Sequence, residues 1–189
     1  EHFILSVGHT YTHKNYEAMI DAMAAYRTRY GDTDLRLEIV GGAANPQYFA
    51  ALEERIRRLD LDDQVKMPGP LPHEEVLDKM SRARLYLVTS RLETFGLTLL
   101  EAMGLGLPVL ASNATCHPEV GGNAALYCEP QDPEDIAEKM HRMLTDQEVA
   151  GGFRERGFAR LADFSWKKTA AEYVRELERA ADDDRKAGR

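Results

Sequence analysis

Short apolar runs alternate with longer amphipathic segments along most of the chain. Compact apolar runs indicate buried strands, whereas apolar residues that recur every three or four positions indicate helices. After the first run, Ala18, Met19, Ala22, Met23 and Tyr26 recur at helical spacing. The pattern therefore predicts that strands and helices follow one another in turn.

Six strands are predicted, at Phe3–Val7, Leu35–Val40, Val65–Met67, Leu85–Val88, Pro108–Ala111 and Ala125–Tyr127. Helices are predicted over about 14–30, 46–60, 73–81, 97–105, 133–145, 147–161 and 165–181. This order favours the α/β class, a doubly wound Rossmann-like parallel sheet with helices on both faces and a helical C-terminal segment. We expect one domain over 1–181 and a charged, disordered tail over 182–189, which lacks apolar anchors.

Composition and charge narrow the classes of partner. The 189 residues include 32 acidic and 24 basic side chains, a formal net charge of −8. A nucleic-acid binder needs a basic face, so we expect no nucleic-acid partner. Two cysteines are too few for a disulfide framework, and a reducing cytosolic setting is the default. The stretch from Phe95 to Ala111 is shorter than a membrane span, which needs roughly 18–20 residues, so we expect a soluble chain without one.

The loop after the first predicted strand is the first candidate site. Gly8 ends the strand, and the next seven residues lead through His9 to Lys14 and Asn15. A glycine lets a ligand approach the backbone, and a lysine at a helix start adds charge to the positive end of the dipole. The loop suits a diphosphate, although a solvated loop with a surface lysine is the alternative. The Walker and GxGxxG patterns are absent.

The segment after the fourth predicted strand is the second candidate. It begins at Ser90 and starts a helix, so the amides of Phe95, Gly96 and Leu97 would face a docked ligand. Glu101 interrupts an otherwise apolar helix, and an ionised carboxylate can accept hydrogen bonds from two adjacent hydroxyls of a diol. Glu93 offers a second carboxylate for sugar hydroxyls. The alternative pairs Glu101 with an internal amide or arginine and leaves Glu93 solvated.

Two glycine-containing turns are a third candidate. Gly41-Gly42 follows the second strand and Pro68-Gly69-Pro70-Leu71 follows the third, and a base could lie between them. Plain turn chemistry is the alternative, and without other context it is the favoured one. The six histidines show no HExxH pattern, so we expect no metal site.

Taken together, these motifs resemble the C-terminal domain of the GT-B-fold retaining glycosyltransferases of family four, also called group one. The most specific part is Glu93-Thr94-Phe95-Gly96-Leu97-Thr98-Leu99-Leu100-Glu101, which looks like the E-x₇-E signature of that family. Gly106-Leu107-Pro108-Val109 and His13-Lys14-Asn15 fall in the same order and spacing as in the family. The resemblance spans almost the whole chain.

The resemblance implies a site for a nucleotide-diphosphate sugar as donor substrate, without a cofactor or metal. Lys14 would neutralise the diphosphate, Glu101 would hold the ribose hydroxyls, and Glu93 would contact the donor hexose. The implied catalytic residues are Lys14 and Glu93, and the implied binding residues are Gly8, His9, Lys14, Gly41, Pro68, Leu71, Glu93, Phe95, Gly96, Leu97, Thr98 and Glu101. Transfer of the hexosyl group to an acceptor hydroxyl would retain the anomeric configuration.

The resemblance also implies a second half. An enzyme of this fold has two such domains, so we expect the acceptor domain upstream of Glu1 and expect this chain alone to turn over little or nothing. Full-length members are cytoplasmic and often lie at the inner membrane surface. Many members carry an arginine where this chain has His9, which implies another cation or a lower donor affinity.

Two other functions fit the same alternation of strands and helices. One is a half-domain of a sugar-nucleotide 2-epimerase, which the E-x₇-E signature disfavours. The other is a non-enzymatic flavodoxin-like binding module, which would leave Glu101 and the Lys14 loop without a purpose.

Overall fold

The computed structural model describes residues 2–187, and within that range the side chains at all positions but 184, 186 and 187. A six-stranded sheet forms its centre, in the order β3-β2-β1-β4-β5-β6, and every neighbouring pair is parallel. The strands are β1 (Phe3–Val7), β2 (Arg36–Val40), β3 (Val65–Gly69), β4 (Leu85–Val88), β5 (Val109–Ser112) and β6 (Leu126–Cys128). The predicted doubly wound α/β fold is confirmed.

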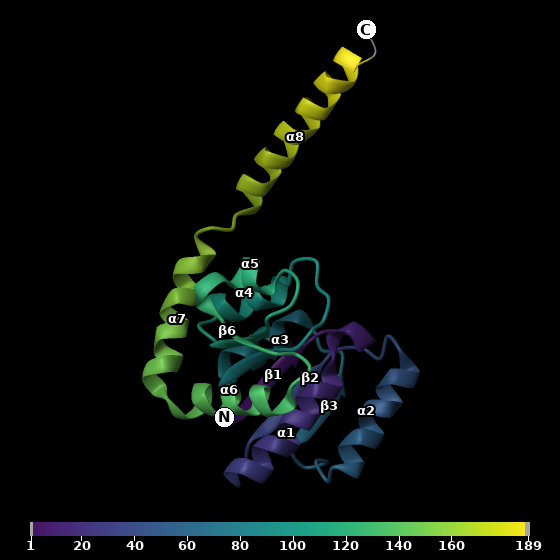
Figure 1. The fold of residues 1–189 in the computed structure, drawn as a ribbon, viewed down its shortest axis with the longest axis vertical. Helices are drawn as coiled ribbons and strands as arrows, with labels where there is room; N and C mark the ends of the chain where they lie inside the picture. Colours follow the sequence, from purple (N-terminus) through teal and green to yellow (C-terminus); the bar gives the residue numbers. More distant parts are fainter. Residues whose placement is uncertain (1, 188–189) are drawn as a thin grey trace.

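Helices cover both faces of this sheet (Figure 1). The helical elements are η1 (Thr12–Lys14), α1 (Tyr16–Tyr30), α2 (Pro46–Arg58), α3 (His73–Arg82), α4 (Leu97–Gly104), α5 (His117–Gly121), η2 (Gly122–Ala124), α6 (Pro133–Thr145), α7 (Gln147–Leu161) and α8 (Trp166–Ala187). Asn45, Asp132 and Asp146 start α2, α6 and α7, each accepting hydrogen bonds from amides of the first turn.

Two apolar clusters lie on the two sides of the sheet. Successive side chains of a strand point to opposite faces, so Ile4 joins the cluster under α1, α2 and α6, whereas Leu5 joins the cluster under α3, α4 and α5. Helix α7 packs on α4, where a Cβ at Gly157 would lie 3.3 Å from Met103. Burial on both faces explains why the strands are continuous apolar runs.

The strand order creates the place for a site. From β1 the chain moves outward through β2 to β3, then returns to β4 on the other side of β1. The loop after β1 therefore leads to α1 on one face of the sheet, and the loop after β4 leads to α4 on the other face. In open parallel sheets a crevice forms at this point, and ligands bind there.

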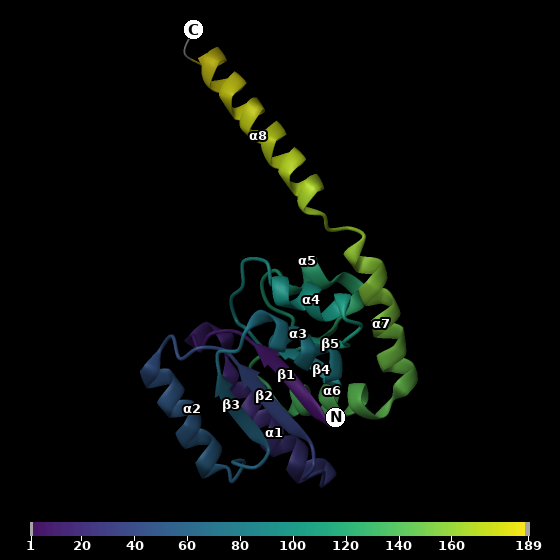
Figure 2. The same cartoon turned by 180° about the vertical axis from the view of Figure 1, so that it is seen from behind.

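Helix α8 projects from the body with no other element beside it in either view (Figures 1 and 2). Its large apolar side chains recur at helical spacing and are exposed, with Trp166 at 78%, Tyr173 at 68% and Leu177 at 58%. No helix within residues 2–187 is long and apolar enough to cross a membrane.

Several element ends differ from the predictions. Helix α8 continues to Ala187, where we expected a disordered tail from 182. No glycine or proline lies between Trp166 and Gly188 to end the helix, and an ion pair joins Arg185 to Asp182 at 3.5 Å. Residues 188–189 lie outside the described residues, and the domain boundary at 181 stays a prediction. Strand β3 includes Pro68, which a sheet tolerates at its edge.

Candidate active site

The loops after β1, β2, β3 and β4 meet at the carboxyl edge of the sheet. The amide of Thr10 donates to the carbonyl of Gly42, and the amide of Gly41 donates to Gly69. On the other side, the amide of Arg91 donates to the carbonyl of His13 at 2.7 Å. The loops predicted to form the site are therefore joined by backbone hydrogen bonds.

The β2 loop approaches the β1 loop so closely that only glycine fits. A Cβ at Gly41 would lie 2.0 Å from the carbonyl oxygen of Gly8, which belongs to the backbone and cannot turn aside. The amide of Gly42 donates to Nδ1 of His9 at 3.1 Å. The ring of His9 thus links the two loops.

Asn15 fixes the loop that carries Lys14. Its backbone is left-handed, with φ of 58°, which separates η1 from α1 where a single helix from 14 was predicted. Its buried side-chain amide donates to the carbonyls of Thr89 and Pro130 at 3.0 and 2.7 Å. Its side-chain oxygen accepts from Arg91 at 2.6 Å. One side chain thus ties the β1, β4 and β6 loops together.

Lys14 and Glu93 form an ion pair that joins the loop after β1 to the loop after β4. The Lys14 Nζ lies 2.5 Å from Oε1 of Glu93, and Ser90 Oγ donates to the same oxygen at 2.9 Å. Both side chains are mostly covered, with 20% and 15% exposed. Burial opposes ionisation of Glu93, but the hydrogen bonds from Lys14 and Ser90 and the charge of Lys14 outweigh it and lower the pKa of the carboxyl. Glu93 is therefore ionised at neutral pH, and the alternative of a solvated Glu93 is wrong.

Helix α4 begins beside this pair. Gly96 has φ of 82°, a left-handed conformation that suits glycine, and it turns the chain into the helix. No side chain accepts a hydrogen bond as N-cap, so the first amides of α4 keep donors for a ligand. Phe95 and Leu97 flank the turn and are exposed at 38% and 50%.

Thr98 and Glu101 lie further along α4. Thr98 is half-buried, and its side chain lies near the hydroxyl of Tyr86. Glu101 is half-buried rather than fully buried as expected. Within residues 2–187 no hydrogen bond or ion pair engages its carboxylate, so the alternative that paired it with an amide or arginine is wrong. Its oxygens therefore remain available as acceptors.

The end of β3 forms the outer rim of the crevice. Pro68 is exposed, whereas Leu71 is half-buried and packs on the apolar cluster under α3. The backbone bond from Gly41 to Gly69 attaches this rim to the β2 loop. Proximity of Pro68 and Leu71 to a base stays a prediction.

Neither α5 nor the buried position of His117 was predicted from the pattern of apolar residues. Helix α5 is only five residues long, too short for a periodic apolar pattern. Pro118 and Glu119, in its first turn, are a local signal of a helix start. His117 is 1% exposed, and burial lowers the pKa of its ring although the charge of Glu93 opposes this.

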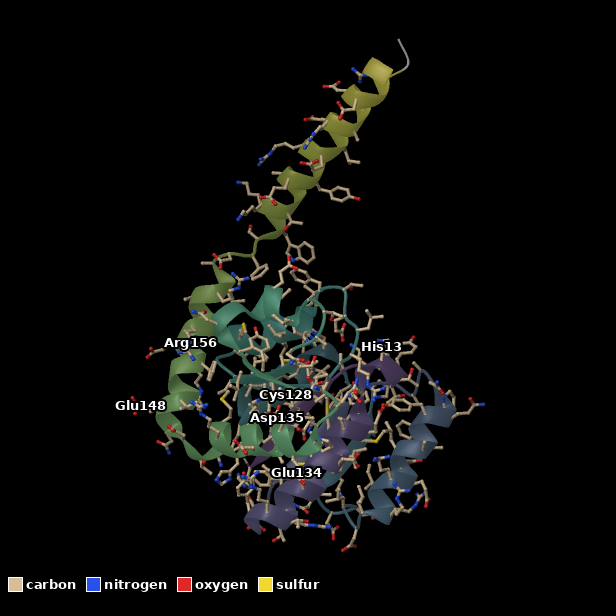
Figure 3. All side chains as sticks on the ribbon, viewed as in Figure 1. His13, Cys128, Glu134, Asp135, Glu148 and Arg156 are labelled. Carbon is tan, nitrogen blue, oxygen red and sulfur yellow. The ribbon has the colours of Figure 1, made fainter. Side chains whose placement is uncertain are left out.

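A second hollow lies away from the Lys14–Glu93 pair. A shallow hollow on α7, lined by residues that include Glu148 and Arg156, lies on the far side of the molecule from His13 (Figure 3). Across the described part of the chain, no group of three or more His, Cys, Asp or Glu side chains could hold a metal ion. The β1 and β4 loops thus bring together a lysine, the Glu93 carboxylate and the uncapped start of α4, which suits an anionic ligand that carries hydroxyl groups.

Known proteins resemble this chain in sequence and in fold. Residues 1–160 match the family model described as glycosyl transferases group 1. Mannosylfructose-phosphate synthase from Agrobacterium fabrum is 28% identical over 90% of this chain, which spans only 39% of that protein. The structure of Anabaena Alr3699/HepE in complex with UDP and glucose superposes with a TM-score of 0.83 and 21% identity, covering 94% of this chain and 48% of that one.

A third match concerns a single domain. The C-terminal domain of the group 1 glycosyl transferase LpcC from Francisella tularensis has a TM-score of 0.74 at 20% identity, covering 85% of each chain. Its fold corresponds to the sheet and helices described above. The match over residues 1–160 decides the family, and the chain therefore belongs to the group 1 glycosyl transferases, with the fold of their C-terminal domain.

Proposed function

We propose that this chain is the donor-binding half of a glycosyltransferase that uses a nucleoside-diphosphate sugar. The observation that carries the proposal is the Lys14–Glu93 ion pair beside the uncapped start of α4. A cation and free helix amides together favour a diphosphate, and a carboxylate beside them favours sugar hydroxyls. The family assignment favours a transferase over the 2-epimerase and flavodoxin-like alternatives.

Each charged group takes a separate part of the donor in this proposal. An ammonium has three donors, so Lys14 keeps its bond to Glu93 while it also reaches the diphosphate. Glu93, ionised because Lys14 and Ser90 hold it so, accepts from the hexose hydroxyls. Glu101 accepts from the ribose diol, since no protein group occupies its oxygens in the described structure. The Pro68–Leu71 rim meets the base.

In this proposal the positive charge of Lys14 and the amides of α4 also promote the transfer reaction. When the bond between sugar and diphosphate breaks, negative charge develops on the leaving diphosphate. Lys14 and the first amides of α4 stabilise that charge without a metal ion, as preorganised donors in other enzymes do. The acceptor hydroxyl attacks from the face of the leaving group and gives its proton to the departing diphosphate oxygen, so the product retains the configuration of the donor.

The acceptor site belongs to a second domain in this proposal. The chain spans 39% of the length of a relative, and α8 exposes Trp166, Tyr173 and Leu177 along one stripe. A hollow of about 340 Å³ between α4 and the start of α8, lined in part by Phe95 and Trp166, continues that apolar surface. We propose that the stripe packs on the upstream half, and that this chain alone binds donor weakly and transfers little or no sugar.

Calorimetric titration of UDP, GDP and ADP into wild type and Glu101→Ala tests the donor site. One nucleotide should bind wild type, and the variant should bind it at least about tenfold more weakly, roughly 1.4 kcal/mol. Wild type should also prefer that nucleotide over its 2′-deoxy form, and Glu101→Ala should lose the preference.

The matched control is Glu138→Ala, which removes an exposed carboxylate on α6. This variant should bind like wild type. Full preference for the ribose form in Glu101→Ala would show that another group holds the diol, and the proposed role of Glu101 would be wrong.

A further inference from the structure

His117 is linked by hydrogen bonds to the loop that carries Glu93. Its Nδ1 lies 2.8 Å from Ser112 Oγ, and Ser112 Oγ donates to the carbonyl of Ser90 at 2.6 Å. A hydroxyl has one proton, so Ser112 must accept from the ring. The imidazole therefore carries its proton on Nδ1, and Nε2 is left as an acceptor when the ring is neutral.

The link reaches the carboxylate through Ser90. Ser90 Oγ donates to Oε1 of Glu93 at 2.9 Å, the oxygen that also accepts from Lys14. A second contact comes from Thr115, whose hydroxyl accepts from the amide of Glu93 at 3.1 Å. Thr115 has φ of 50°, which β-branched residues rarely adopt, so this segment is held in a strained shape where it supports Glu93.

The ring also lies near the turn into α4, without a hydrogen bond to it among the described residues. A Cβ at Gly96 would lie 3.5 Å from Cδ2 of His117 and 3.8 Å from Nε2. Burial favours the neutral ring, while the nearby charges of Glu93 and Lys14 act on it in opposite directions. A neutral, fully buried imidazole thus lies beneath both Gly96 and the loop of Glu93.

We propose that His117 is a positioning residue of the donor site, which orients Glu93 toward the hexose through Ser112 and Ser90. The inference rests on the proposed function, because it assigns Glu93 to the sugar and Lys14 and Glu101 to the nucleotide. It follows that the loss of His117 lowers the contribution of the hexose to affinity and spares the contribution of the nucleotide.

Two variants separate this role from simple packing. His117→Asn keeps an N–H group near the place of Nδ1, whereas His117→Leu fills similar space without a donor. For His117→Leu we expect the Kd of the nucleotide sugar to rise about tenfold and that of the free nucleotide to change less than about twofold. His117→Asn should restore most of the affinity for the nucleotide sugar. Equal weakening of both ligands in His117→Leu, or no weakening of either, would overturn the inference.

An NMR titration of the Glu93 carboxyl tests the link without any ligand. His117→Leu should raise the pKa of Glu93, because the Ser90 hydrogen bond is no longer held in place, and His117→Asn should leave it near the wild-type value. Ring ¹⁵N shifts of wild type should show the proton on Nδ1. If wild type bound no nucleotide, the proposed function would fail, and an unchanged pKa of Glu93 in His117→Leu would separately overturn the link.

Discussion

Gly41→Ala is expected to destabilise the domain by about 3 kcal/mol, the upper part of the usual range for overpacking. The new Cβ would lie 2.0 Å from the carbonyl oxygen of Gly8 and 3.0 Å from the amide nitrogen of His9, so the β1 and β2 loops must separate. Donor binding should fall with stability, because the same movement displaces the loop that leads to Lys14. Urea denaturation followed by circular dichroism measures the change.

Gly151→Ala is the matched control for this substitution. Gly151 lies within α7, and no atom outside its neighbours lies within 4 Å of the position of a new Cβ. Alanine there should leave stability unchanged or raise it by about 0.5–1 kcal/mol. Equal stability of the two variants would contradict the close approach of the loops.

Lys14→Met is expected to weaken nucleotide binding by about 1.5–3 kcal/mol, roughly 10- to 100-fold in Kd. The substitution keeps the length of the side chain and removes the charge that pairs with Glu93, which we propose also binds the diphosphate. The matched control is Lys139→Met, which breaks a comparable ion pair with Asp135 on α6, at 2.6 Å and away from the crevice. Calorimetry should show a large loss for Lys14→Met and none for Lys139→Met. Equal affinities would contradict the assignment of Lys14.

The same variant should alter how stability depends on pH. The folded state holds the pKa of Glu93 below its ordinary value of 4.5, so the pair contributes stability above that value and loses it as pH falls through the folded pKa. Lys14→Met removes a main cause of the lowered pKa. Its stability should therefore rise less with pH across the acidic range than that of wild type, and an unchanged slope would place the origin of the shift elsewhere.

Periodicity and apolar runs predicted most of the fold, because a doubly wound sheet buries its central strands on both faces and its helices on one side. Helices α6 and α7 have the predicted limits, since Asp132 and Asp146 mark their starts in the sequence. Helix α5 was not predicted because five residues are too few to show the apolar periodicity of a helix. The end of α8 was misplaced because lack of apolar anchors does not by itself end a helix.

The candidate site was predictable only as a set of residues. Their order along the chain placed Lys14 and Glu93 on loops at one edge of the sheet, but not in contact. The ion pair depends on Asn15, whose side chain joins three loops that are distant in sequence. The part of His117 depends on the direction of the Ser112 hydroxyl, which only the three-dimensional arrangement reveals.

The central claim is that a nucleotide sugar binds in the crevice between the β1 and β4 loops. The most direct test is a ¹⁵N-resolved NMR titration of this chain with three nucleoside-diphosphate hexoses, which carry uridine, guanosine or adenosine. One of them should shift the amide signals of Gly8, Gly96 and Leu97, and leave those of Gly151 and Gly152 in the α7 hollow unchanged. Absence of shifts with all three donors, or shifts confined to α7, would contradict the account.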